Sequence, residues 1–329
     1  MRSKPLANDL TWSVSRNRLF RSCPRAYYYQ YYGAWGGWAF DAPEQPRLLY
    51  ALKQMTSFPL WGGSVVHQVI QEALQQMRES RILPTLDALQ QRARALLNAG
   101  WKQSRDRLWQ QDPKRNVNLF EHYYAREGEE ITREETDALK EKVFSALDGF
   151  LSSGVPQTVL PLDANQWGQI DVLNSFVVGE LPAMETAPAL PLKVWCALDF
   201  SYVDNEGVLH ILDWKTGTEH REELRLQLAC YALYAMDTLH FPLEKLQLKG
   251  VFLNDSGRVS TYEISSESLV NAKTQILNSA QAMRNCLRDP VENLAEEEAF
   301  PCTQNPQCCE RCPFLQVCPA AQANGLMPQ

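Results

Sequence analysis

The chain has 329 residues, of which 45% are hydrophobic, and its formal net charge is −7 at pH 7. This composition supports a sizeable apolar interior, and the negative charge argues against a generic nucleic-acid coat protein. The sequence has no apolar run of about eighteen residues and no secretory signal, so neither a membrane span nor export is expected, and the expected location is cytoplasmic.

The N-terminal segment combines arginines with aromatic residues. Arg18, Arg21 and Arg25 recur at spacings of three and four, which predicts one exposed stripe on a helix. Single-stranded bases stack on aromatic rings while arginine neutralises the backbone, so a nucleic-acid contact is indicated. Ordinary packing of a tyrosine-rich helix explains the same pattern, and a mixture is expected. The aromatic residues are Phe20, Tyr27, Tyr28, Tyr29, Tyr31, Tyr32, Trp35 and Trp38.

A helical pattern begins near Gly63. Its apolar residues recur at helical spacing, and His67 lies beside this stripe. Taken alone, such a histidine is more simply a satisfied core residue than a metal ligand. The apolar positions are Val66, Val69, Ile70, Ala73, Leu74 and Met77.

The middle of the chain reads as helical. One helix is predicted over 83–111, and a second over 132–151, which Thr132 and Glu135 begin as a capping box. We interpret 81–165 as an all-helical insertion between an N-terminal part, 1–80, and an α/β core, 166–290, with a cysteine segment at 291–329. The insertion either frames an active site or presents a solvated face.

The core contains a predicted hairpin of strands 194–203 and 208–212, joined by a turn at 204–207. Folding about Glu206 sets Asp199 across from Asp213, one strand spacing apart. Asp213 and Lys215 then share one face, and Trp214 points to the other. Carboxylates on one face suit Mg²⁺ or Mn²⁺, and water activated by such an ion can cleave a phosphodiester. The alternative is a surface turn in which Lys215 merely pairs with Asp213.

The next helix places Gln227 and Tyr231 on one face, since they are four residues apart. They contact the acids and lysine, or they belong to ordinary helix packing. Strands are predicted at 246–254 and 258–264, followed by a helix at 267–288.

The nine cysteines are concentrated near the C-terminus, where five fall within seventeen residues. Thiols stay reduced in the cytosol, so the cluster indicates metal binding, with Cys23 as a distant fourth ligand. Four thiolates hold either zinc or a [4Fe–4S] cluster. Cys302 and Cys308 are spare, and we expect Cys196, Cys230 and Cys286 to be packing residues.

Several motifs in order resemble the PD-(D/E)XK nucleases of the RecB-like branch. The motifs are Gly63-xxx-His67, Asp199, Asp213-x-Lys215 and Gln227-xxx-Tyr231. Ser13-Val-Ser15 with Cys23-Pro24-Arg25-Ala26-Tyr27, and the Cys-xx-Cys-xxxxx-Cys spacing of Cys309, Cys312 and Cys318, resemble its iron–sulfur subgroup. That subgroup includes the AddB nuclease domain and the CRISPR-associated exonucleases. Cys196 departs from the family, which has glycine three residues before the first acid, and Asp213 stands where related nucleases often have Glu.

The resemblance implies a role for each residue. His67, Asp199 and Asp213 would ligate Mg²⁺ or Mn²⁺, with the Trp214 carbonyl possible as a further ligand. Lys215 would orient or deprotonate the attacking water. Gln227 and Tyr231 would brace Lys215 or contact the substrate backbone. A [4Fe–4S] cluster, with zinc as the alternative, would be held by Cys23, Cys309, Cys312 and Cys318, and would join the N- and C-terminal segments.

The implied fold is α/β, a central mixed β-sheet flanked by helices. The implied activity is metal-dependent DNA exonuclease, on single-stranded ends, in DNA repair, recombination or CRISPR adaptation. Because the chain has no Walker A motif, a helicase or CRISPR adaptation proteins are candidate partners. Two alternatives stay open: a catalytically degenerate iron–sulfur DNA-binding subunit, and a zinc-stapled interaction protein.

Overall fold

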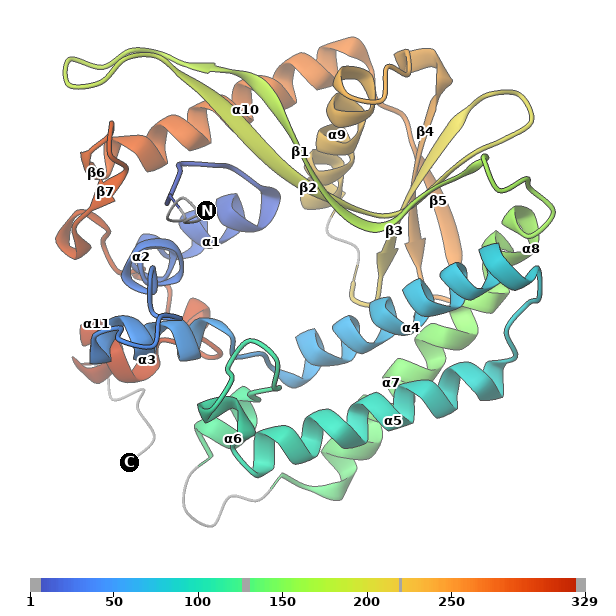
Figure 1. Cartoon of the computed structure of the whole chain (residues 1–329), viewed down its shortest axis with the longest axis horizontal. Coiled ribbons are helices and arrows are strands. Elements are labelled where there is room, and N and C mark those ends of the chain that lie inside the picture. The colour runs from blue at the N-terminus through green and yellow to red at the C-terminus, as the bar shows by residue number, and fades with distance from the viewer. Residues whose placement is uncertain (1–6, 126–130, 219–220, 324–329) are drawn as a thin grey trace, which may run out of the picture.

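A central mixed sheet organises the molecule (Figure 1), in a computed structural model that describes residues 7–125, 131–218 and 221–323. The strand order is β1-β2-β3-β4-β5, in which β3 and β4 are parallel and the other neighbours antiparallel. The predicted α/β class with a mixed sheet is therefore confirmed. The strands are β1 (Trp167–Leu181), β2 (Leu190–Val203), β3 (Leu209–Lys215), β4 (Leu246–Phe252) and β5 (Arg258–Tyr262).

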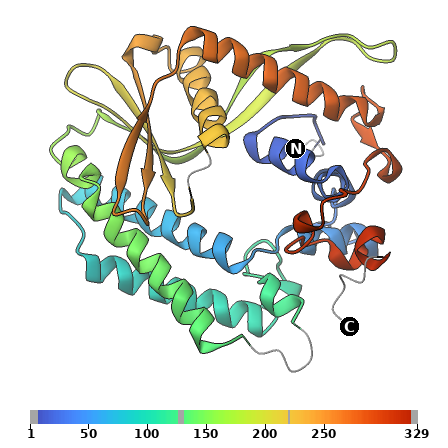
Figure 2. The same cartoon turned by 180° about the vertical axis from the view of Figure 1, so that it is seen from behind.

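Helices cover both faces of the sheet (Figures 1 and 2). On one face, α9 (Arg221–Asp237) and α10 (Ser266–Asn285) share a core with Leu209 and Ile211 of β3. On the other, α4 (Phe58–Ser80) and α7 (Arg133–Ser152) share a core with Leu212 and Trp214. This alternation along β3 follows from the two-residue period of a strand, and it leaves Asp213 and Lys215 on the α9 face as predicted.

The segment predicted to be an insertion packs into the second core. Its helices are α5 (Leu86–Arg105), the 3₁₀ turn η2 (Leu108–Gln110), α6 (Phe120–Tyr123), α7 and α8 (Val155–Val159). The capping box that begins α7 is confirmed, because Thr132 and Glu135 exchange side-chain and backbone hydrogen bonds. Since α5 and α7 pack directly against α4, the helical segment supports the helix that carries His67.

The two ends of the described chain lie together (Figures 1 and 2). Arg25 pairs with Glu297 at 2.6 Å, and the rings of Tyr29 and Phe314 are 5.4 Å apart. The elements here are α1 (Val14–Ser22), α2 (Pro24–Tyr28), the π-helical η1 (Tyr29–Gly33), α3 (Glu44–Lys53), β6 (Leu287–Asp289), β7 (Leu294–Ala295), η4 (Glu297–Ala299), η5 (Pro306–Cys308), η6 (Leu315–Val317) and α11 (Pro319–Ala323); η3 (Leu243–Lys245) precedes β4.

The predicted arginine stripe is wrong at Arg25. Helix α1 ends at Ser22, and Cys23 takes an extended conformation before Pro24 begins α2, since a residue that precedes proline disfavours helix. The Arg25 side chain is only 13% exposed and pairs with Glu297, whereas Arg18 and Arg21 stay on the surface side of α1.

The aromatic residues of this segment divide into buried and exposed ones, as expected. Tyr27 and Tyr29 are buried, whereas Trp35 and Trp38 are partly exposed. Within the described ranges, none of the helices has both the length and the apolarity that a bilayer crossing requires.

Candidate active site

The hairpin register brings the two predicted acids together. The ladder runs from Val203–Leu209 to Phe200–Leu212, which is the register of a turn centred on Glu206. Asp204 holds that turn by accepting hydrogen bonds from the amides of Glu206 and Val208, both at 2.9 Å. The register prediction is therefore confirmed, although the ladder ends one pair before the acids.

Beyond the ladder, the Asp199 side chain takes the place of a backbone hydrogen bond between β2 and β3. Its Oδ2 accepts a hydrogen bond from the Trp214 amide at 2.8 Å. This bond satisfies a buried backbone donor and fixes the carboxylate against the end of β3. The sequence pattern placed the acid correctly but did not show this contact.

Asp213 lies at the centre of a buried hydrogen-bond network and is 1% exposed. Its Oδ1 accepts from Gln227 Nε2 at 2.7 Å and from the Tyr231 hydroxyl at 3.1 Å. Lys215 Nζ lies 2.6 Å from Asp213 Oδ2 and donates to Gln227 Oε1 at 2.9 Å. Gln227 Nε2 also donates to the Tyr231 hydroxyl at 2.7 Å. The structure thus assembles these four residues from β3 and α9.

The network changes the interpretation of Tyr231. The side chain is 2% exposed, and its hydroxyl contacts Asp213 beneath the cleft. This position suits a residue that orients the carboxylate rather than one that contacts a substrate backbone.

Burial and charge shift two pKa values at this site. Burial raises the pKa of Asp213 to about 6, with a further rise from the charge of Asp199, while Lys215 and His67 oppose the shift. Burial alone would lower the pKa of His67, but the ion pair with Asp199 outweighs it and raises that pKa to about 9. At neutral pH the Asp213 carboxyl is therefore mostly ionised and the His67 imidazole mostly protonated.

Helix α4 places His67 beside the acids. Its Nδ1 lies 3.4 Å from Asp199 Oδ1. The helix approaches the end of β3 closely at Gly63, where an added Cβ would lie 3.2 Å from Thr216 Oγ1. A side chain at this position, one turn before His67, would therefore press on the Thr216 hydroxyl at the end of β3.

A cleft of about 1170 Å³ opens over this network. Its walls come from α1, α4 and the edge of β1, and its floor from β2, β3 and α9. Arg18 stands on the wall, with Nη1 3.8 Å from a carboxylate oxygen of Glu223. Arg21 and Arg25 do not line this cleft.

Asp199, Asp213 and His67 at the floor of the cleft are ligand types that fit a hard divalent cation, but their donor atoms do not converge on one point. Among the described residues, no three His, Cys, Asp or Glu side chains are close enough together to hold a metal ion. Asp213 Oδ2 is buried, and among the described residues it is paired with the Lys215 ammonium alone, at 2.6 Å. Two carboxylates beside an imidazole are a donor set that suits Mg²⁺ or Mn²⁺.

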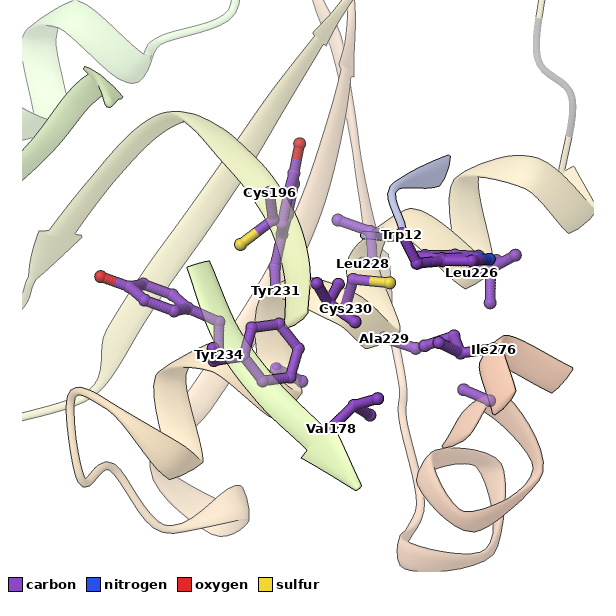
Figure 3. Close-up of a cluster of buried hydrophobic side chains, with 14 of the residues drawn as sticks. Trp12, Val178, Cys196, Leu226, Leu228, Ala229, Cys230, Tyr231, Tyr234 and Ile276 are labelled. Carbon is purple, nitrogen blue, oxygen red and sulfur yellow. The ribbon is translucent and has the colours of Figure 1, made fainter. Parts of the chain in front are cut away.

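Cys196 occupies the position where a family glycine was expected. It is buried in the same cluster as Tyr231 and Cys230 (Figure 3), and burial raises the pKa of its thiol to about 12. The site therefore accommodates this side chain as an apolar packing residue, as predicted for Cys196 and Cys230.

The clustered cysteines meet Cys23 at the junction of the two chain ends. A small cavity is lined by Cys23, Cys302, Cys308, Cys309, Cys312 and Cys318. All nine cysteines are free thiols, and Cys302 Sγ is 3.9 Å from Cys318 Sγ. The convergence of Cys23 on a segment almost 300 residues away could not be read from local spacing.

The family model of the PD-(D/E)XK nuclease superfamily matches residues 11–319, a range that includes every residue of the network and all of the clustered cysteines. A search of the curated proteins found no match.

Proposed function

The chain belongs to the PD-(D/E)XK nuclease superfamily, and we propose that it is a metal-dependent exonuclease acting on single-stranded DNA ends. The observation that carries the proposal is the complete network around Asp213. A degenerate relative has no need to keep a buried carboxylate at a raised pKa, because burying a charged group costs folding free energy.

The residues of this chain divide the catalytic work. Gln227 and Tyr231 hold Asp213 Oδ1, and Oδ2, which pairs with the Lys215 ammonium in this structure, would exchange that partner for the metal ion. Asp199, anchored by the Trp214 amide, and His67 would complete the ligands, with the Trp214 carbonyl as a further candidate. A bound Mg²⁺ or Mn²⁺ would supply an activated water and stabilise charge on the phosphate.

Lys215 has the position expected of the residue that orients water. Its ammonium is held between Asp213 and Gln227, and Lys215 lines the cleft. A fixed cation beside the scissile phosphate stabilises the negative charge that develops in the transition state.

The cleft favours a DNA strand over a small molecule. It is lined by residues of three helices and four strands, and Arg18, 3.8 Å from Glu223, offers a cation on its wall. Uncharged polar side chains, Ser13, Ser64, Gln68 and Gln71, supply hydrogen bonds without sequence preference.

We assign the chain to the iron–sulfur subgroup of the RecB-like branch. Cys23, Cys309, Cys312 and Cys318 would hold a [4Fe–4S] cluster, and their common cavity between the chain ends supports this. Reduced thiols are consistent with the proposed cytoplasmic location. A helicase or CRISPR adaptation complex would then supply the DNA end.

The test compares wild type with Asp213→Asn on end-labelled single strands, circular single strands and duplexes, with Mn²⁺ or Mg²⁺. We expect wild type to shorten linear single strands progressively and the variant to be inactive. Equal digestion by both proteins would refute the catalytic assignment. Cleavage of circles would replace exonuclease by endonuclease, and DNA binding without digestion by wild type would support the degenerate DNA-binding alternative.

Anaerobic purification tests the cluster. A brown protein with stoichiometric iron and sulfide is expected, whereas a colourless protein containing zinc would identify the alternative occupant.

A further inference from the structure

A second pocket lies outside the catalytic cleft, where the helical segment meets the C-terminal cysteine segment. Its volume is about 300 Å³, at the lower end of the range for ligand sites. The end of α5, the turn η2 and the short helix α6 form it, and no residue lines both this pocket and the cleft.

The hydrogen bonds of Ser104 determine which ring nitrogen of His122 carries the proton. Ser104 is 2% exposed, its Oγ accepts from the Leu119 amide at 2.9 Å, and it lies 2.8 Å from His122 Nδ1. The Ser104 hydroxyl proton is buried and needs an acceptor, and among the described residues that acceptor is His122 Nδ1. The hydroxyl therefore donates to Nδ1.

That arrangement leaves His122 with its proton on Nε2. Burial, and then the charge of Arg105, lower the pKa of His122, so the ring is neutral at pH 7. The Nε2 donor has no acceptor in the described part of the chain, so it is available to a ligand.

Positive charge adds to this donor. Arg105 forms a two-bond pair with Asp106, at 2.8 and 3.2 Å. Arg107, two residues on, makes no side-chain hydrogen bond or ion pair within the described ranges, and no acidic residue lines the pocket. A guanidinium that is free to pair suits the oxygens of a phosphate.

An aromatic wall faces the same space. The rings of Trp109 and Tyr123 are 5.3 Å apart, and the Tyr123 hydroxyl donates to Gln316 Oε1 at 2.6 Å. This bond ties the wall to the C-terminal segment and fixes the ring. Aromatic faces of this kind stack on bases without strong sequence preference.

We propose that this pocket binds a nucleoside monophosphate, with the phosphate on Arg107 and His122 and the base against Trp109. The same chemistry is presented by a free mononucleotide and by the phosphorylated end of a strand. The site does not depend on the proposed catalytic activity, because it shares no residue with the cleft.

Titration calorimetry of the full chain tests the proposal. The Asp213→Asn protein in EDTA is titrated with dAMP, deoxyadenosine and inorganic phosphate, which separates this site from metal-dependent binding in the cleft. We expect deoxyadenosine to bind at least on the order of tenfold more weakly than dAMP, since it lacks the charge-assisted bonds.

Matched variants locate the ligand. Arg107→Ala should weaken dAMP on the order of tenfold, while Arg115→Ala, which removes an exposed arginine from the same loop, should have no effect. Trp109→Leu should weaken dAMP but leave inorganic phosphate unchanged. Thermal melting confirms that each variant is folded.

Two outcomes would overturn the proposal: no heat of binding at millimolar dAMP, or unchanged dAMP affinity in both folded variants. A 5′-phosphorylated single strand distinguishes the ligand source. Binding that is as tight as that of dAMP and needs the 5′-phosphate identifies a strand end, and binding of dAMP alone identifies the free nucleotide. Neither result requires hydrolysis, so the outcome is independent of the nuclease test.

Discussion

Replacing Gln227 by alanine should slow DNA hydrolysis on the order of 100-fold while leaving the protein folded. The amide of Gln227 bonds to a carboxylate, an ammonium and a phenol at once, through contacts of 2.7 to 2.9 Å with Asp213, Lys215 and Tyr231. Its loss leaves Lys215 held by the ion pair with Asp213 alone and removes one of the two hydrogen bonds to Asp213 Oδ1, while the Tyr231 hydroxyl keeps its bond to the carboxylate.

The magnitude follows from the two bonds to charged groups. Each such bond contributes about 1.5–3 kcal/mol, and water entering from the open cleft replaces part of that. A net loss of about 3 kcal/mol in transition-state stabilisation corresponds to a rate change on the order of 100-fold.

The assay is single-turnover digestion of an end-labelled single strand at saturating Mn²⁺, with Gln75→Ala as the matched control, because Gln75 is an exposed glutamine of the same cleft. Gln227→Glu preserves the size but sets a second acceptor against Asp213, so it should be at least as slow as Gln227→Ala. A folded Gln227→Ala protein within about threefold of wild type would refute the reasoning, since that is under 1 kcal/mol.

Three further predictions concern charge and cysteine. Mn²⁺ binding at pH 7.5 should release close to one proton in wild type but not in His67→Gln, because the pKa of His67 is raised to about 9 and a metal-bound imidazole must be neutral. Calorimetry in two buffers measures the proton release, and equal release by the two proteins would contradict this prediction. Without metal, the raised pKa of Asp213 means that the stability of wild type falls as pH rises from about 4 to about 6. Asp213→Asn should therefore be more stable than wild type at pH 8, by up to about 3 kcal/mol in urea unfolding, and this difference should disappear near pH 4. Cys312→Ala should lower the melting temperature and the iron content together, with Cys286→Ala as control; an iron-free Cys312→Ala protein that melts like wild type would show that the cluster does not stabilise the fold.

Local sequence patterns correctly predicted those features that depend only on residues close together in the chain. The turn at 204–207 and the strand period predicted the register of Asp199 and Asp213, and the opposite directions of Lys215 and Trp214, because turn chemistry and alternation depend on neighbours. The capping box at Thr132 was predictable for the same reason. The family resemblance then supplied roles that residue spacing alone does not assign.

Tertiary structure decided what depends on distant partners. Arg25 fits a helical stripe by spacing, yet the break at Cys23 and the acid at Glu297 place it in a partly buried ion pair. Tyr231 supports Asp213 from beneath because α9 packs on the sheet face that carries the carboxylate.

The sequence by itself therefore determined the order of elements, the sheet hairpin and the chemical types at its end, since these follow from periodicity and turn residues. The family resemblance implied that His67 meets Asp199 and that Cys23 meets the C-terminal thiols, but only the tertiary structure gives the helix packing and the contacts that bring them together. The physical reason is that long-range contacts depend on how whole helices pack, which no short window of residues encodes.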